Sequence, residues 1–357
     1  MHPVLDPSGV RRRVAGAGFI TLDVALEDSS RAVAYSGVGG TTGNVLSILA
    51  FFGWHSLPLV HVGADRVGQA VVSELARIGV DTRFMAFQPF LRTPMVFQWQ
   101  DQLSLAPRYS FQCPVCGSAR KFDSAQVSPA TDEALQTASR SNVFFFDRVT
   151  ENSVQMAEAA RSGGAFVFFE PSSVNAASEL MIRSLRAAHV VKYSIDRIEG
   201  SLSSLLDSGF VEIQTMGARG LRFRRHSLVP DWVELPALRA SWVMDTAGAG
   251  DWCSAGFIHA LSRMTDLSSP FDLSYNSIHQ ALRHAQAVAA LSCHHLGARG
   301  LMQAGEASDA LEQAEQILAS HQLYAPGIPW ESAHVYPRPR LHSDVMQLRS
   351  LCCQSLT

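Results

Sequence analysis

The chain alternates short, continuous apolar runs with longer segments whose apolar positions recur at helical spacing. Strands of the buried, parallel type are expected at residues 14–20, 57–62, 142–146, 165–169, 190–191 and 211–215. Helices are expected at residues 44–52 and 68–78, and a glycine directly follows each of them, Gly53 and Gly79. This alternation predicts a doubly wound, mostly parallel α/β sheet flanked by helices.

Two regions depart from that pattern. Residues 93–100 and 108–112 read as exposed strands whose faces carry both polar and apolar side chains. They predict a small β-sheet lid over about 93–122. Beyond about Ser320 the chain is rich in proline and looks irregular. The expected organisation is one domain over residues 1–320, followed by an irregular C-terminal tail over residues 321–357.

Composition narrows the class of protein. The 357 residues are 47% hydrophobic with a net charge of -3, which is ordinary for a soluble globular chain and gives no case for nucleic acid or an anionic membrane as partner. No apolar run is long enough to span a bilayer. Residues 14–20 suit a first strand better than a signal peptide, so we expect a cytoplasmic protein whose six cysteines are reduced.

The most informative segment runs from Val243 to Leu261, where an apolar run meets a small-residue turn and then a helical segment. Gly248, Ala249 and Gly250 leave their backbone N–H groups accessible to an anion at the positive end of a helix. Asp251 stands at the mouth of that anion hole, where a carboxylate can take a proton from an attacking hydroxyl. The pattern indicates phosphoryl transfer onto a hydroxyl. The alternative is a simple turn in which Asp251 is the helix N-cap.

The full string Asp245-Thr-Ala-Gly-Ala-Gly-Asp251 resembles the C-terminal signature of the PfkB (ribokinase-like) family of carbohydrate and nucleoside kinases, Asp-Thr-x-Gly-Ala-Gly-Asp. Gly39-Gly40-Thr-Thr-Gly-Asn44 is similar to that family's Gly-Gly-x-x-x-Asn substrate motif, and residues 61–68 resemble its Gly-x-Asp-x-x-Gly segment. The resemblance covers roughly residues 14–305. It implies a ribokinase-like fold, ATP with Mg²⁺, a sugar or nucleoside acceptor, and a homodimer formed through the lid.

The resemblance also implies roles for particular residues. Asp251 would be the catalytic base, and the acceptor would be held by Asp23, Gly39, Gly40 and Asn44. The nucleotide would be bound by Lys192, Thr215, Gly217, Gly220, Thr246, Ala287 and Gly297. An amide such as that of Asn44 suits a sugar hydroxyl because it both donates and accepts hydrogen bonds.

One motif departs from the family. Where members often carry Asn-x-x-Glu to organise Mg²⁺, this chain has Ser194 and Arg197, although a shift in register would bring Asp196 or Glu199 into play. Arg197 would remove a negative charge from the metal's surroundings. A non-catalytic sugar- or nucleoside-binding regulator on the same fold therefore stays open as an alternative.

A second alternative is an NADP-dependent oxidoreductase, because the glycines of residues 37–43 precede a helix as in a dinucleotide fingerprint. The fingerprint is weak, since residues 31–36 are not the first strand and no acidic residue ends a strand about twenty residues on.

Cys113 and Cys116 have the spacing of half a zinc knuckle. The pair is either a tight turn with reduced thiols or part of a zinc site completed by histidines, by the tail or by a second chain. In the same lid region, Phe97 and Trp99 either stack on a ligand or pack. Arg222, Arg224 and Arg225 are expected at a solvated strand edge.

Overall fold

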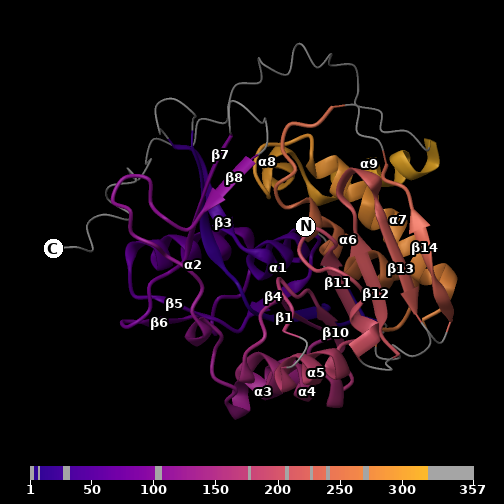
Figure 1. Ribbon diagram of the computed structural model, residues 1–357, viewed down its shortest axis with the longest axis horizontal. Helices are drawn as coiled ribbons and strands as arrows, with labels where there is room; N and C mark the ends of the chain where they lie inside the picture. The colour runs from indigo at the N-terminus through magenta and orange to yellow at the C-terminus, as the bar shows by residue number, and fades with distance from the viewer. Residues whose placement is uncertain are drawn as a thin grey trace.

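The computed structural model describes residues 4–6, 9–26, 33–100, 107–175, 178–205, 209–225, 228–238, 242–267 and 273–320 (Figure 1). The predicted tail over residues 321–357, with Cys352 and Cys353, lies outside the described residues.

The main sheet has the strand order β14-β13-β12-β11-β10-β9-β1-β4. Its strands are β1 (Arg13–Ala17), β4 (His55–Pro58), β9 (Val143–Phe146), β10 (Phe166–Phe169), β11 (Val190–Ser194), β12 (Val211–Thr215), β13 (Leu221–Arg225) and β14 (Val229–Leu235). Neighbours from β4 to β12 pair in parallel, and β13 and β14 add antiparallel strands at one edge. The predicted mostly parallel sheet is confirmed.

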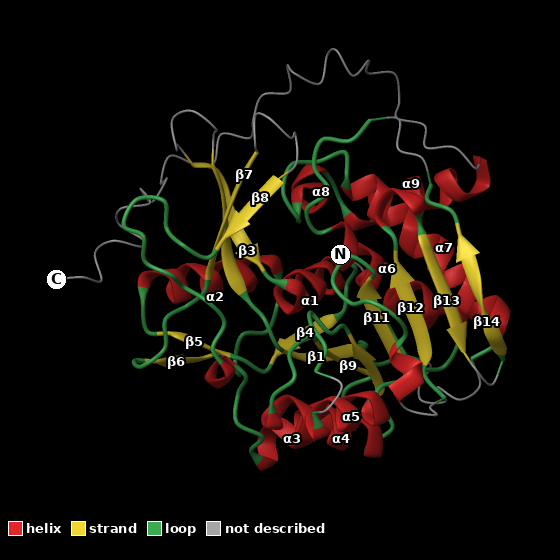
Figure 2. Ribbon diagram, in the orientation of Figure 1, coloured by secondary structure: helices red, strands yellow, loops and turns green. Residues whose placement is uncertain are grey.

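Helices cover both faces of this sheet (Figure 2). One face carries α1 (Thr41–Phe51), α6 (Ala249–Met264), α7 (Tyr275–Ser292), α8 (Gly300–Ala304) and α9 (Ala307–Ser320), and the other carries α3 (Asp132–Ser139), α4 (Glu151–Ser162) and α5 (Glu179–Ala187). Short 3-10 turns lie at Ser124–Gln126, Leu202–Leu205 and Gly217–Arg219. Alternation along the strands sends Phe145 to the first core and Phe144 and Phe146 to the second, which explains why these strands are apolar throughout.

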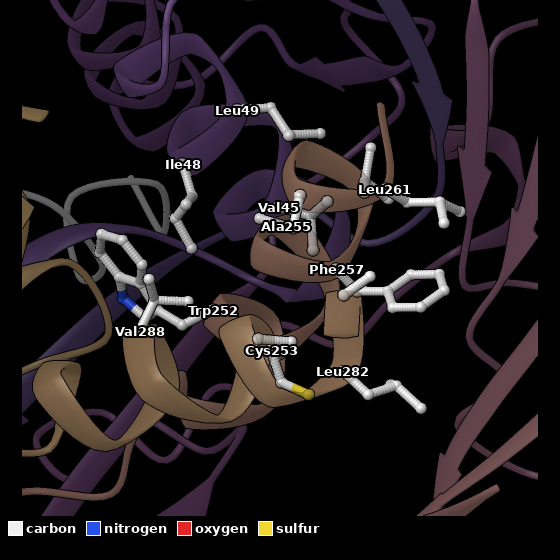
Figure 3. Packing of buried hydrophobic residues seen from close by; sticks show 14 of the residues in the cluster. Val45, Ile48, Leu49, Trp252, Cys253, Ala255, Phe257, Leu261, Leu282 and Val288 are labelled. Atoms are coloured by element: carbon white, nitrogen blue, oxygen red, sulfur yellow. The ribbon is translucent and has the colours of Figure 1, made fainter. Parts of the chain in front are cut away.

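Helix α6 forms the centre of the first core and packs against both α1 and α7 (Figure 3). Trp252 and Phe257 of α6 have no exposed surface, and Val45 of α1 is equally buried. Gly256 permits the close approach to α7, because a Cβ there would overlap Val288. This packing fixes the N-terminal turns of α1 and α6 relative to each other.

The lid is a separate sheet with the strand order β3-β2-β7-β8. It consists of β2 (Thr21–Leu26), β3 (Val33–Gly39), β7 (Met95–Gln100) and β8 (Pro107–Ser110). Helix α2 (Arg66–Ile78) packs beneath it, and β5 (His61–Gly63) pairs with β6 (Ala86–Gln88) nearby. The predicted lid strands are present, and two further strands join them.

The expected first strand over residues 14–20 is therefore wrong in its length. It ends at Ala17, and Thr21 begins lid strand β2. The reason is a tertiary contact: the N–H of Phe19 donates to the carboxylate of Asp147, 2.8 Å away, and not to a neighbouring strand. The run over residues 57–62 divides in the same way, between β4 and β5.

The expected solvated edge at Arg222, Arg224 and Arg225 is also wrong. β13 lies between β12 and β14, and Arg225 is buried with its Nη1 3.2 Å from the carbonyl of Leu273. The guanidinium groups of Arg222 and Arg224 lie over the ring of Trp232, at 4.5 Å and 4.4 Å from its centroid. These arginines stabilise the antiparallel end of the sheet.

Candidate active site

The turn before α6 is held in shape by Asp245. Its Oδ1 accepts a hydrogen bond from the N–H of Ala247 and its Oδ2 accepts one from Gly297, both at 2.9 Å. Gly248 caps the helix with φ 76°, a left-handed conformation that favours glycine, and a Cβ there would lie 2.5 Å from Ala298. The glycine at position 248 is therefore needed by the backbone itself.

The free backbone amides differ from the predicted anion hole in one residue, Ala249. The N–H of Ala249 already donates to the carbonyl of Thr246 at 3.2 Å, so this predicted donor is engaged. In the described part of the chain, the N–H groups of Gly248, Gly250 and Asp251 have no acceptor within the protein. Three amides at the N-terminus of a 16-residue helix are thus open to an anion.

Asp251 and Asn44 meet directly, although 207 positions separate them in the chain. The Nδ2 of Asn44, in the first turn of α1, donates to Oδ2 of Asp251 at 2.6 Å. Two buried acceptor atoms nearby, Oδ1 of Asn44 and Oδ1 of Asp23, have no hydrogen-bond partner. Buried polar atoms are rarely left unpaired, so these two oxygens suit the hydroxyl groups of a bound molecule.

Asp23 lies on lid strand β2, where it pairs with Gly37 of β3, and its carboxylate reaches over Gly39. A Cβ at Gly39 would overlap the Asp23 carboxylate, and a Cβ at Gly40 would overlap the carbonyl of Phe19. The paired glycines therefore make room for the strand and its carboxylate. The structure brings the predicted acceptor residues Asp23, Gly39, Gly40 and Asn44 to one edge of the main sheet.

Glu170 is the principal residue that the sequence analysis missed. It follows β10, and its two carboxylate oxygens accept hydrogen bonds from Nζ of Lys192 at 2.6 Å and from Oγ of Ser254 at 2.5 Å. Burial raises the pKa of Asp251 to about 7, Glu170 adds to the rise, and Asn44, Lys192 and Arg197 oppose it. Asp251 is thus a carboxyl group poised to exchange a proton near neutral pH.

Lys192 lies beside the anion turn, because a Cβ built at Gly250 would be 3.8 Å from its Nζ. Its side chain is only 2% exposed. Burial acts to lower the pKa of Lys192, but Glu170, Cys253 and Asp251 outweigh it and the net direction is upward. The ammonium group stays charged where a phosphate would approach Gly250.

The other predicted nucleotide residues divide into two groups. Thr215 ends β12, Gly217 and Gly220 form the turn after it, and Thr246 and Gly297 lie in the turns around Asp245. Ala287, in contrast, has no exposed surface and packs in the core on α7. The Ala287 side chain therefore has no surface exposed to a nucleotide in this structure.

Asp147 and Arg148 were missed as well. Asp147 is buried, accepts hydrogen bonds from Phe19 and Thr42, and forms an ion pair of 2.9 Å with Arg148. Burial raises the pKa of Asp147, and Glu170 adds to the rise. Both Asp147 and Glu170 directly follow an apolar strand, at the edge where ligands of α/β sheets bind, and that position was the signal that could have identified them.

In the lid, Phe97 has no exposed surface and Trp99 packs against the core between the lid sheet and α2. Packing is therefore their role. Tyr109 pairs with Gln98 across β7 and β8, on the face that also carries Asp23, and it is 55% exposed. Burial, Asp245 and Asp23 raise the pKa of Tyr109 to about 12, against Arg197. Tyr109 is thus a lid aromatic on the same face as Asp23.

The described residues offer few ligands for a metal ion. Among the described residues, no group of three or more His, Cys, Asp or Glu side chains could hold a metal ion. Ser194 Oγ accepts the N–H of Asp196 at 3.2 Å, and Arg197 is exposed in the turn after β11. These residues do not fit a magnesium site made by protein alone. Mg²⁺ in phosphoryl-transfer sites commonly keeps waters and phosphate ligands, so it would enter with the nucleotide.

The Cys113–Cys116 pair lies in a tight turn of the lid. The N–H of Gly117 donates to the carbonyl of Cys113 at 2.8 Å, and the N–H of Cys113 donates to Ser118 at 2.9 Å. Within the described ranges no third zinc ligand accompanies the pair. A zinc site would need ligands from a second chain or from the tail.

The dinucleotide fingerprint lacks its structural setting. The strand before the glycines of residues 37–43 is β3, which belongs to the lid sheet and pairs in antiparallel fashion with β2. A dinucleotide fold requires the first strand of a parallel sheet at that place. No helix in the described part of the chain has the length and apolarity to cross a bilayer.

Comparison with known proteins finds the same family that the sequence motifs resemble. Residues 150–304 match the model of the family described as "pfkB family carbohydrate kinase". No match was found among curated proteins. The resemblance of the sequence to the PfkB family is confirmed by this match and by the structural neighbours.

Several solved structures share the fold. A fructokinase with bound ATP from Xylella fastidiosa has a TM-score of 0.66 at 20% identity, covering 86% of this chain and 99% of its own. A putative ribokinase from Agrobacterium tumefaciens gives 0.67 at 17% identity, with the same coverage. An aminoimidazole riboside kinase from Salmonella enterica, complexed with aminoimidazole riboside and an ATP analog, gives 0.62 at 21% identity, covering 84% and 99%. The ribokinase-like architecture is thereby established.

Proposed function

We propose that this protein transfers the γ-phosphoryl group of ATP to a hydroxyl of a sugar or nucleoside. The observation that carries the proposal is the contact between Asp251 and Asn44, which joins the anion turn to the acceptor residues in one site. The fold neighbours that bind ATP, sugars or nucleosides support the same class of reaction.

In this proposal the acceptor hydroxyl lies against Asp251, with Asp23 and Asn44 holding neighbouring hydroxyls through their unpaired oxygens. Asp251 takes the hydroxyl proton as the oxygen attacks the γ-phosphorus, and the bond from that phosphorus to the bridging oxygen breaks so that ADP leaves. The amides of Gly248, Gly250 and Asp251 and the ammonium of Lys192 stabilise the charge on the transferring phosphoryl oxygens. Mg²⁺, when bound with the nucleotide, supplies further neutralisation of phosphate charge.

The experiment is a phosphate-transfer assay with ATP over a panel of sugars and nucleosides. We expect ADP formation that depends on one acceptor class, and no oxidation of NADPH in parallel reactions. A chain that oxidises or reduces the panel with a nicotinamide cofactor, and forms no ADP, would refute the proposal.

A non-catalytic sugar- or nucleoside-binding regulator is the second candidate, and Ser194 and Arg197 favour it. Arg197 brings a positive charge where the family often has a glutamate, and this charge acts to lower the pKa of Asp251. Acceptor binding by calorimetry, without ADP formation over the whole panel, would select this candidate.

Localisation in the cytoplasm and a homodimer through the lid are also proposed. Zinc would join the proposal only as an ion shared between copies at Cys113 and Cys116. Half an equivalent of zinc or more per chain, in a protein that is dimeric in solution, supports that idea, and a lower content refutes it.

A further inference from the structure

A buried charged cluster lies between the lid and the turn that supports the anion site. Arg299, whose side chain is 2% exposed, places Nη2 at 2.7 Å from Oε1 of Glu74 on α2. The same nitrogen is 3.4 Å from the hydroxyl of Tyr35 on β3. Oε2 of Glu74 accepts the N–H of Val38 at 2.8 Å, so the cluster also holds the backbone of β3.

Strand β3 is built to admit these groups. A Cβ at Gly37 would lie 2.5 Å from Nη2 of Arg299 and 2.6 Å from the hydroxyl of Tyr35, and a Cβ at Gly39 would overlap the carboxylate of Asp23. Two glycines in one strand therefore bring the arginine cluster and the acceptor carboxylate to the same face of β3.

Arg299 is equally fixed to the anion side. Two residues directly before Arg299 in the chain are held by the anion side. The N–H of Gly297 donates to Asp245, and the carbonyl of Ala298 accepts the indole N–H of Trp252 at 2.8 Å. Gly248 rests against Ala298. A continuous set of contacts thus runs from the anion turn through Arg299 to β3.

Charged and titratable groups around Asp23 come from four parts of the chain. Arg299 precedes α8, Glu74 is on α2, Tyr35 is on β3 and Tyr109 is on β8. Burial raises the pKa of Asp23 to about 7, while Arg299 acts to lower it and Glu74 acts to raise it. The ionisation of Asp23 is therefore sensitive to both members of the buried ion pair.

We propose that Arg299 is a positioning residue for the acceptor site: with Glu74 as its counter-charge, it holds strand β3 and places a buried positive charge on the face of that strand over which the Asp23 carboxylate lies. The role of Asp23 in holding the acceptor rests on the proposed function. The electrostatic link between Arg299 and Asp23 does not, and it can be measured without any substrate.

The test is a pH titration of the Asp side-chain carboxyl carbons by ¹³C NMR on the full chain, with the Asp23 signal assigned by Asp23→Asn. Arg299→Met removes the positive charge and is expected to raise the pKa of Asp23 by about 1 or more. Glu74→Gln removes the negative charge and is expected to move it downward. Tyr35→Phe, which changes no charge at neutral pH, is the matched control and should leave it within about 0.3.

Shifts of opposite sign are the outcome that a merely structural role for the pair does not produce. Where Arg299→Met alone does not fold, combining it with Glu74→Gln removes both charges and should return the pKa of Asp23 close to its original value. Shifts of the same sign, or none, overturn the proposal. Loss of ADP formation in the wild-type assay would refute the kinase function and leave this titration unaffected.

Discussion

At the scale of single residues, Asp251 can accept a proton only in its ionised form. Burial and the neighbouring Glu170 raise its pKa to about 7, so a large fraction is protonated below neutral pH. We expect kcat, measured with both substrates saturating, to fall about tenfold per pH unit below an apparent pKa near 7. Glu170→Gln should move this acidic limb to lower pH. A profile that stays flat down to pH 5 would contradict the assignment of Asp251 as base.

Gly39 offers a second test at this scale. In Gly39→Ala the added methyl group would overlap the Asp23 carboxylate and displace it. We expect the acceptor KM to rise about tenfold or more, equivalent to at least 1.4 kcal/mol of lost binding, with a smaller change in kcat. Gly209→Ala is the matched control, because its Cβ meets nothing within 4 Å. An unchanged acceptor KM in Gly39→Ala would remove Asp23 from the site.

The residues that sequence could identify were those inside short, dense motifs. Asp251, Asn44 and the paired glycines were predicted, and the structure places them together. Glu170 and Asp147 were not, because each is a single acid after an apolar strand and carries no motif of its own. The hydrogen bond from the Ala249 amide to Thr246 also could not be predicted from the sequence, since it depends on how the turn closes.

At the scale of elements, the site depends on how closely α6 packs against α7. Gly256→Ala places a methyl group against Val288, and overpacking of this kind typically costs about 1–3 kcal/mol. We expect a lower free energy of unfolding in urea, with activity per folded molecule reduced as the start of α6 shifts. Val288→Ala added to Gly256→Ala should restore part of the stability. Additive losses in the double variant would show that the two residues do not compete for space.

Most elements followed from periodicity, because strands buried on both faces are apolar throughout and helices end at glycines such as Gly79, which is left-handed in the structure. The errors occurred where tertiary contacts redirect the chain. The carboxylate of Asp147 accepts a hydrogen bond from the N–H of Phe19, so β1 ends early and Thr21 begins a strand of the lid. The burial of Arg225 depends on Gly209 and Leu273, which are distant in sequence.

At the scale of the whole molecule, the site is assembled from opposite ends of the domain. The acceptor residues lie between Asp23 and Asn44, and the anion turn lies more than 200 positions later. We expect ATP to raise the midpoint of thermal unfolding, since a ligand at 100 times its Kd stabilises the folded state by about 2.7 kcal/mol. NADPH should give no shift, and Gly248→Ala, if folded, should lose the shift with ATP. Stabilisation by NADPH alone would contradict the nucleotide assignment.

The central claim, that Asp251 is the base for phosphoryl transfer, is tested most directly by the turnover of Asp251→Asn with ATP and the acceptor found in the panel. Because the folded pKa of Asp251 lies above its unfolded value, ionisation costs stability as pH rises from about 4 to 7. The variant should therefore be at least as stable as the wild type at pH 7, and its thermal unfolding at that pH checks that a loss of turnover is not a loss of fold. We predict a turnover lower by about 10²–10⁴-fold. Turnover near the wild-type rate would contradict the account.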